Sequence, residues 1–194
     1  MIKRIYPEKM LNVFSDVTPD LLRKYEISTL LVDIDNTLAP YEEPEPSEAV
    51  RQWVDHIKAS GIRIVLISNN CEPRVNRFNQ SLGLPALFDS GKPGTGKIKK
   101  FLTDKGIPQT GLGCLGDQLL TDAWLAHKLG GAALIVPPIS DKSTALFRFK
   151  RRVERRTILA YMEHHEEYSY PFEKAAGSPE WKQKRGMTHE HVSG

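Results

Sequence analysis

The stretch TLLVDIDNTL, residues 29–38, carries the strongest indication of the fold. Its first half is a short apolar, β-branched run, which is typical of a strand buried on both faces of a parallel sheet. Its second half places two carboxylates, Asp33 and Asp35, where the chain leaves that strand. Because open α/β sheets bind ligands at the carboxyl ends of their strands, this stretch predicts a buried strand that ends in a polar site.

The same pattern continues over the predicted core, residues 29–137. Further strand-like runs are IRIVLIS (62–68), ALF (86–88), LGCLG (112–116) and AALIV (132–136). Amphipathic segments between them end at glycines, as helices do. Strands that alternate with helices at this spacing predict right-handed βαβ units. We therefore expect an α/β fold: a Rossmann-like three-layer sandwich with a mainly parallel five-stranded sheet.

Two further helices flank this core. Residues 18–25 predict a short helix with Thr18 as its N-cap, and residues 144–162 predict a basic C-terminal helix. From 166 to 194 the chain is polar with scattered Pro, Gly and His, which indicates a flexible tail. We expect residues 1–165 to form a single domain.

The bulk composition places the chain among ordinary globular proteins. Its net charge of +3 is small, and it contains neither the ~18–20 apolar residues of a membrane span nor a signal-peptide core. Its two cysteines, Cys71 and Cys114, lie far apart and form no CxxC pair. A reduced, cytoplasmic protein is the simpler interpretation.

Polar residues also follow the later strands. These are Ser68-Asn69-Asn70 after the second, Lys92 after the third, and Gly116-Asp117 after the fourth, with Asp122 five residues further on. Converging carboxylates supply the oxygen ligands that Mg²⁺ prefers, and hydroxyl, backbone N–H and lysine groups can hold a phosphate. Taken singly, each would be a turn, capping or surface residue. Their arrival at successive strand ends favours a joint site.

The stretch GKPGTGKI, residues 91–98, allows a competing interpretation as a Walker A phosphate loop of an NTPase. A true loop continues with Ser or Thr, whose hydroxyl binds Mg²⁺, but here the next residue is Ile98. We therefore predict that Lys92, rather than Lys97, meets the phosphate.

Together these motifs resemble the haloacid dehalogenase (HAD) superfamily of phosphatases. They are more similar still to its YqeG-type members, which are related to mitochondrial phosphatidylglycerophosphate phosphatase. The resemblance covers roughly residues 5–162. It rests on TPDLL, DIDNTL, SNN, the Lys-Pro pair, GDQLLTD and FRFKRRVERR.

The resemblance implies a Mg²⁺-dependent phosphomonoesterase that forms an aspartyl-phosphate. The implied catalytic residues are Asp33 as nucleophile, Asp35 as general acid and base, and Ser68 and Lys92 beside the phosphoryl group. The implied metal-binding residues are Asp33 and Asp117 through their side chains and Asp35 through its backbone carbonyl, with Asp122 supporting from nearby. The implied phosphate-binding residues are Asn36, Thr37, Ser68, Asn69 and Lys92.

The spacing of the motifs leaves no room for a cap domain. About 30 residues separate Asp35 from Ser68, and fewer separate Ser68 from Lys92. By the resemblance, capless members act on bulky substrates. The helix 144–162 bears on the choice of substrate, because residues 148–156 hold six Arg or Lys against one Glu. It either lies on an anionic membrane or packs its apolar face on the core, and both can hold.

The resemblance and this helix favour phosphatidylglycerophosphate, an anionic phospholipid, as the substrate. They also favour peripheral association with the inner face of the membrane. One alternative is a HAD phosphatase of another bulky substrate, either a phosphoprotein or a nucleic acid. A second is a non-catalytic HAD protein that binds nucleic acid or a ribosome, although the helix lacks the aromatic platform of known RNA modules.

Overall fold

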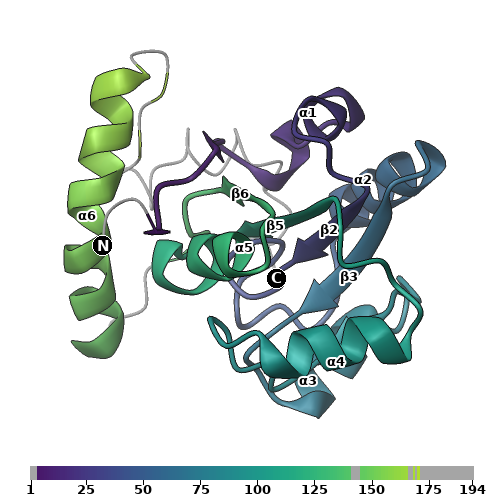
Figure 1. Ribbon diagram of the computed structural model, residues 1–194. Coiled ribbons are helices and arrows are strands. Elements are labelled where there is room, and N and C mark those ends of the chain that lie inside the picture. Colours follow the sequence, from purple (N-terminus) through teal and green to yellow (C-terminus); the bar gives the residue numbers. More distant parts are fainter. Residues whose placement is uncertain (1–3, 141–144, 166–167, 169, 171–194) are drawn as a thin grey trace.

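The computed structural model describes residues 4–140, 145–165, 168 and 170 (Figure 1). Its centre is one six-stranded sheet with the order β1-β6-β5-β2-β3-β4, in which all neighbouring strands pair in parallel. The strands are β1 (Lys9–Met10), β2 (Thr29–Val32), β3 (Arg63–Ile67), β4 (Ala86–Leu87), β5 (Leu112–Gly116) and β6 (Ala132–Ile135).

The predicted count of five strands is wrong by one, because β1 adds a sixth at the edge beside β6. Lys9 pairs with Leu134 and Met10 with Ile135. The strand is two residues long and has no apolar run of its own, so local sequence cannot indicate it. Tertiary contacts hold it: the Glu8 N–H donates to the Ala133 carbonyl at 3.0 Å.

Helices cover both faces of the sheet. They are α1 (Pro19–Lys24), α2 (Glu48–Ala59), α3 (Glu72–Asn79), α4 (Gly96–Asp104), α5 (Trp124–Lys128) and α6 (Ala145–His164), with the short turns η2 (Phe14–Asp16) and η3 (Leu119–Ala123). The N-cap that the sequence indicates is present, since Thr18 accepts a hydrogen bond from the Leu21 N–H. Ser47 likewise caps α2 by accepting one from the Val50 N–H. The α/β class and the three layers are confirmed.

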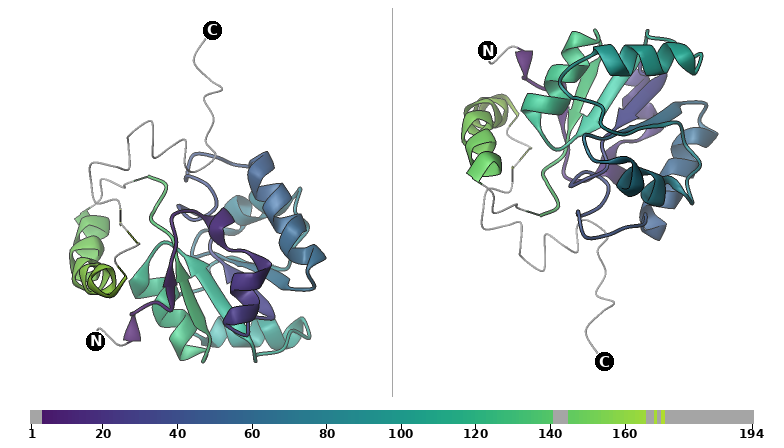
Figure 2. Two further views of the ribbon diagram at one scale, coloured as in Figure 1. Left: turned by 90° about the horizontal axis from the view of Figure 1, so that it is seen from above. Right: turned by 90° about the horizontal axis from the view of Figure 1, so that it is seen from below.

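Alternate residues of the buried strands face opposite layers. On β2, Leu30 and Val32 belong to the core cluster shared with α1, α2 and α3, while Leu31 belongs to the cluster shared with α4 and α5. Figure 2 shows these two groups of helices on either side of the strands. A strand covered on both faces needs apolar residues throughout, which accounts for the continuous apolar run at 29–32.

The register of the central strands brings their carboxyl ends to one edge. Val32 on β2 pairs with Leu66 on β3 and with Leu115 on β5. The residues that follow these strands, including Asp33, Ser68 and Asp117, therefore leave the sheet side by side. No further domain is inserted between β2 and β6 within residues 4–140, as the lack of a cap requires.

Helix α6 lies at one side of the molecule, away from α2 and α3 (Figures 1 and 2). It packs on the core through one face, whose buried side chains are Glu154, Thr157, Ile158 and Tyr161. The Tyr161 hydroxyl accepts a hydrogen bond from the Met10 N–H at 3.1 Å, and Glu154 Oε1 accepts one from the Leu120 N–H at 3.0 Å. The predicted packing on the core is therefore present, on a face more polar than expected.

The predicted flexible tail, residues 166–194, lies almost wholly outside the described residues. Two of its members, Tyr168 and Tyr170, are described and are buried against the core beside α6. The ring of Tyr168 meets that of Tyr161 edge-on, at 5.7 Å between centroids. Within the described helices, none is both long enough and apolar enough to cross a bilayer.

Candidate active site

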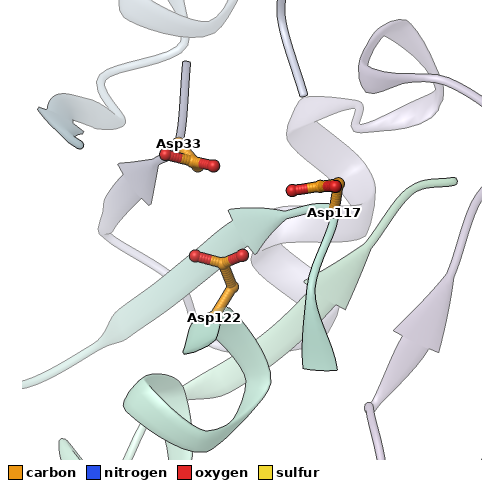
Figure 3. Close-up of side chains that lie close together, drawn as sticks. All are labelled: Asp33, Asp117 and Asp122. Atoms are coloured by element: carbon orange, nitrogen blue, oxygen red, sulfur yellow. The ribbon is translucent and has the colours of Figure 1, made fainter. Parts of the chain in front are cut away.

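Three carboxylates meet at the carboxyl edge of the sheet. Asp33 follows β2, Asp117 follows β5, and Asp122 lies in the π-helical turn η3. One oxygen of each lies within 4.8 Å of the others, and all three residues are buried. Figure 3 shows the carboxyl groups turned toward a common space. Such a group of hard oxygen donors suits a divalent cation of the Mg²⁺ type.

Lys92 supplies the positive charge of this cluster. Its Nζ lies 2.8 Å from Asp33 Oδ1 and 2.7 Å from Asp122 Oδ1, and its side chain is 2 % exposed. Burial alone would lower the pKa of Lys92, but the carboxylates of Asp122 and Asp33 outweigh it and raise that pKa. The lysine is therefore charged and held between two acids.

Asp33 lies in the least favourable surroundings for a negative charge. The pKa of its carboxyl is raised to about 8, chiefly by burial. The carboxylates of Asp122 and Asp117 add to the rise, and the charge of Lys92 opposes it. One lysine does not neutralise three acids, so the cluster favours an additional cation.

Local sequence explains the position of Asp122. A Cβ on Gly116 would collide with the Asp122 carboxyl, so the last residue of β5 has to be glycine for the acid to fit. Asp122 Oδ2 then accepts hydrogen bonds from the Gln118 N–H and the Thr121 hydroxyl, each at 3.1 Å. The spacing in GDQLLTD thus places Gly116 beside Asp122, whose buried carboxylate has partners on both oxygens.

Asn69 fixes the backbone on both sides of Lys92. Its Oδ1 accepts from the Lys92 N–H at 2.8 Å, and its Nδ2 donates to the Lys92 carbonyl at 3.0 Å. The Ser90 hydroxyl also donates to Asn69 Oδ1, at 2.8 Å. Asn69 was predicted to bind phosphate; its side chain lines the pocket but positions the lysine loop.

The glycines of GKPGTGKI form a turn rather than a Walker loop. Gly91 has a φ of 72°, and the Gly94 N–H donates to the Gly91 carbonyl at 2.7 Å. Lys97 is exposed and donates to the Asp89 carbonyl at 2.8 Å, outside the carboxylate cluster. As predicted, Lys92 is the lysine of this stretch that enters the site.

A pocket of about 400 Å³ opens beside the cluster. Its lining residues are Asp33, Asp35, Tyr41, Ser68, Asn69, Asn70, Lys92, Gln118 and Thr121. Among them Ser68 is buried, and its Oγ accepts a hydrogen bond from the Asn70 N–H at 3.0 Å. The structure therefore brings the predicted catalytic set Asp33, Asp35, Ser68 and Lys92 into one cavity.

Asp35 is not part of the three-carboxylate group. Its Oδ1 lies 3.0 Å from Arg74 Nη2, and its Oδ2 accepts a hydrogen bond from Asn70 Nδ2 at 3.0 Å. Arg74 is a site residue that the sequence did not indicate. The available signal was a basic residue in the first turn of the helix that follows Ser68-Asn69-Asn70, which is too common a pattern to single out.

Asn36 and Thr37 are not among the residues that line the pocket, and their binding of phosphate stays a prediction. Asn36 has a φ of 64°, so the chain turns sharply there. Its Oδ1 instead accepts hydrogen bonds from the Ser140 N–H at 3.2 Å and from the Ser140 hydroxyl at 2.9 Å. Asn36 thus ties the loop after β2 to the segment after β6.

The parallel sheet carries a polar group after each of four strands: paired aspartates after β2, a serine after β3, a lysine after β4 and acids after β5. This arrangement defines a phosphatase of the HAD superfamily. The family model for mitochondrial PGP phosphatase matches residues 2–138. The chain belongs to this family.

The chain is also similar to individual known proteins. The probable phosphatase YqeG of Bacillus subtilis strain 168 is 29 % identical over 161 residues, covering 82 % of this chain and 94 % of that protein. Among solved structures, the putative 3-deoxy-D-manno-octulosonate 8-phosphate phosphatase of Vibrio cholerae shares 15 % identity over 80 % of this chain and 94 % of its own, with a TM-score of 0.48. The 3-deoxy-D-manno-octulosonate 8-phosphate phosphatase of Moraxella catarrhalis, solved in complex with magnesium, phosphate and KDO, shares 12 % identity. The match covers 76 % of this chain and 99 % of that one, with a TM-score of 0.44.

Proposed function

We propose that this phosphatase is a Mg²⁺-dependent phosphomonoesterase that forms an aspartyl-phosphate on Asp33. The observation that carries the proposal is the contact of Asp33 with Lys92, which both line the pocket. The ammonium of Lys92 can bind the oxygens of a phosphoryl group. The carboxylate of Asp33 beside it is then placed to attack the phosphorus. Such positioning with opposite charge supplies most of the protein's contribution to phosphoryl transfer.

The residues present fit a divalent cation. Asp33, Asp117 and Asp122 are close enough to share one, and when all three are ionised their charge exceeds the single charge of Lys92. When bound, Mg²⁺ would offset the charge of the phosphate and favour the ionised form of Asp33. Asp35 offers no carboxylate to this group, since its oxygens bind Arg74 and Asn70.

In the first half-reaction, an Asp33 oxygen attacks phosphorus and the bond from phosphorus to the leaving oxygen breaks. Asp35 gives its proton to that oxygen, so an alcohol leaves. In the second half-reaction, Asp35 takes a proton from water while the water oxygen attacks phosphorus. The bond from Asp33 to phosphorus then breaks and inorganic phosphate is released. Ser68 and Lys92 hold the phosphoryl oxygens throughout.

Phosphatidylglycerophosphate is the substrate that we favour. The family description names it, in the abbreviation PGP, for other members. The lack of an inserted domain between β2 and β6 also supports it, since nothing in that part of the chain would keep a lipid headgroup from the pocket.

The outer face of α6 supports a membrane surface as the place of action. Arg152, Arg155 and Arg156 are exposed on it, and Leu159 beside them is 40 % exposed. Basic residues next to an exposed apolar one suit an anionic leaflet, where each adds about 1 kcal/mol of attraction. We therefore propose peripheral association at the inner face of the membrane by a protein that resides in the cytoplasm.

Phosphate release tests the proposal. Wild-type protein should release phosphate from phosphatidylglycerophosphate in mixed micelles with Mg²⁺ and not with a chelator. Sugar phosphates, nucleotides and phosphopeptides form the comparison panel. Ample activity on another phosphomonoester without activity on the lipid would refute the substrate, and inactivity on the whole panel would favour a non-catalytic binding protein.

A further inference from the structure

Arg74 contacts Asp35 from outside the pocket. Its Nε lies 3.1 Å and its Nη2 3.0 Å from Asp35 Oδ1, and its side chain is only 13 % exposed. Asp35 lines the pocket, whereas Arg74 is not among the lining residues. The guanidinium is therefore placed to act on a substrate through Asp35 rather than by contact with the phosphoryl group.

The guanidinium of Arg74 is itself fixed by three further contacts. Its Nη1 donates to the Pro44 carbonyl and its Nη2 to the Pro40 carbonyl, each at 3.3 Å. The buried ring of Phe78, four residues further along α3, has its centre 5.2 Å from Arg74 Cζ. Because a guanidinium is planar and presents its donors in a rigid fork, these contacts fix the direction from which it meets Asp35.

The two oxygens of the Asp35 carboxyl have different surroundings. Oδ1 faces two guanidinium nitrogens, whereas among the described residues Oδ2 accepts one hydrogen bond, from Asn70 Nδ2 at 3.0 Å. Asn70 is held in turn, since its Oδ1 accepts from the Cys71 N–H at 2.8 Å. A carboxylate oxygen has two lone pairs, so Arg74 occupies those of Oδ1, while Oδ2 keeps one for a proton.

We propose that Arg74 is a positioning residue for proton transfer, which holds Asp35 so that Oδ2 gives a proton to the leaving oxygen and later takes one from water. The inference rests on the proposed function, in which Asp35 is the acid and base. As the bond from phosphorus to the leaving oxygen breaks, the proton on Oδ2 moves to that oxygen. A carboxyl turned away from this direction loses the transfer, while Asp33 can still attack phosphorus.

Two esters with the same ring separate this role from a general loss of the site. The leaving group of p-nitrophenyl phosphate departs without a proton, whereas that of phenyl phosphate needs one. With Mg²⁺, R74Q should lower kcat/KM for phenyl phosphate by about a hundredfold, the effect of misplacing a catalytic group, and leave that for p-nitrophenyl phosphate nearly unchanged. Because both esters are measured on one preparation, the ratio of the two values does not depend on how much of the variant folds.

The division between kcat and KM on p-nitrophenyl phosphate is a second readout. Hydrolysis of the aspartyl-phosphate needs Asp35 as base, so in R74Q this step becomes limiting and kcat and KM should fall together. A variant that is merely less folded would lose kcat at constant KM. R77Q is the matched control, since Arg77 lies three residues later on α3 in an exposed pair, 3.9 Å from Glu45, and its loss should change neither ester.

The double variant D35N/R74Q tests whether Arg74 acts through Asp35. With the acid already removed, R74Q should lower kcat/KM for phenyl phosphate by less than about twofold further, because residues that act as a unit have non-additive effects. A D35N protein that loses as much to R74Q as wild type does would overturn the inference.

Two further outcomes would overturn the inference alone. One is an R74Q variant that keeps the wild-type ratio of the two esters at the wild-type rates. The other is an equal loss of kcat/KM on both esters, because Arg74 would then act on the phosphoryl group or on the fold. A wild-type protein that releases phosphate from neither ester overturns the proposed function, and the inference with it.

Discussion

Cations occur in this molecule in two opposite surroundings. Lys92 lies inside the carboxyl edge of the sheet, where its side chain is 2 % exposed and contacts two acids. Arg152 and Arg156 lie on the outer face of α6 and are exposed. In the first region one charge contacts two buried acids at once, so it fixes the positions of both. In the second region each charge acts on whatever approaches the surface, and screening by salt weakens it.

The largest effect is expected inside the site. K92M leaves Asp33 and Asp122 buried without their cation, which should cost about 3–5 kcal/mol of unfolding free energy and nearly all phosphatase activity. Denaturant unfolding with and without Mg²⁺ measures the first effect. We expect Mg²⁺ to stabilise K92M more than it stabilises wild type, since the metal then provides the only positive charge among these acids. A K92M protein as stable as wild type without metal would show that the pairs contribute little.

A smaller effect is expected on α6. R152E/R156E should weaken binding to vesicles that contain anionic lipid by tenfold or more, because each arginine contributes about 1 kcal/mol near the surface. Hydrolysis of a water-soluble phosphomonoester should stay at the wild-type rate. The control K58E/K99E makes the same charge change at exposed lysines of α2 and α4. Equal binding by both double variants would remove α6 as the membrane face.

The smallest effect is expected where a pair is half-buried. His127 Nε2 lies 3.1 Å from Glu8 Oε2, which also accepts from the Ala133 N–H at 2.6 Å. The hydrogen bond with Glu8 raises the pKa of His127 despite partial burial. Burial alone would raise the pKa of Glu8, but the bonds from His127 and Ala133 outweigh it and lower that pKa.

These shifts set a pH window. A raised histidine pKa stabilises the fold below the unfolded value of 6.5, and this contribution is lost as pH rises through the folded value. A lowered glutamate pKa acts above the unfolded value of 4.5 and is lost as pH falls through the folded value. Between about pH 4.5 and 6.5, H127Q should therefore reduce the unfolding free energy by less than about 1 kcal/mol. The reduction should become smaller as the pH rises further. A difference that is constant up to pH 9 would contradict the pairing.

Sequence was informative where local pattern and chemistry coincide. The continuous apolar runs of β2, β3 and β5 predict buried parallel strands, and the polar residues after them predict the site. Gly116 and Asp122 are recognisable from spacing because the missing side chain of one makes room for the other.

Sequence failed where a residue acts through distant contacts. Strand β1 exists because Glu8 reaches Ala133, and Arg74 matters because three separated groups converge on it. The turn at Asn36 sends that side chain to Ser140, over a hundred residues away in the chain. None of these contacts leaves a local periodicity that could be recognised beforehand.

The central claim is that Asp33 carries the phosphoryl group. D35N should accumulate this intermediate from p-nitrophenyl phosphate with Mg²⁺, because the good leaving group departs without an acid while hydrolysis lacks its base. After an acid quench, peptide mass spectrometry should find the phosphoryl group on Asp33. D33N should show no label and retain less than about a hundredth of wild-type turnover. A label on another residue, or an active D33N protein, would contradict the account.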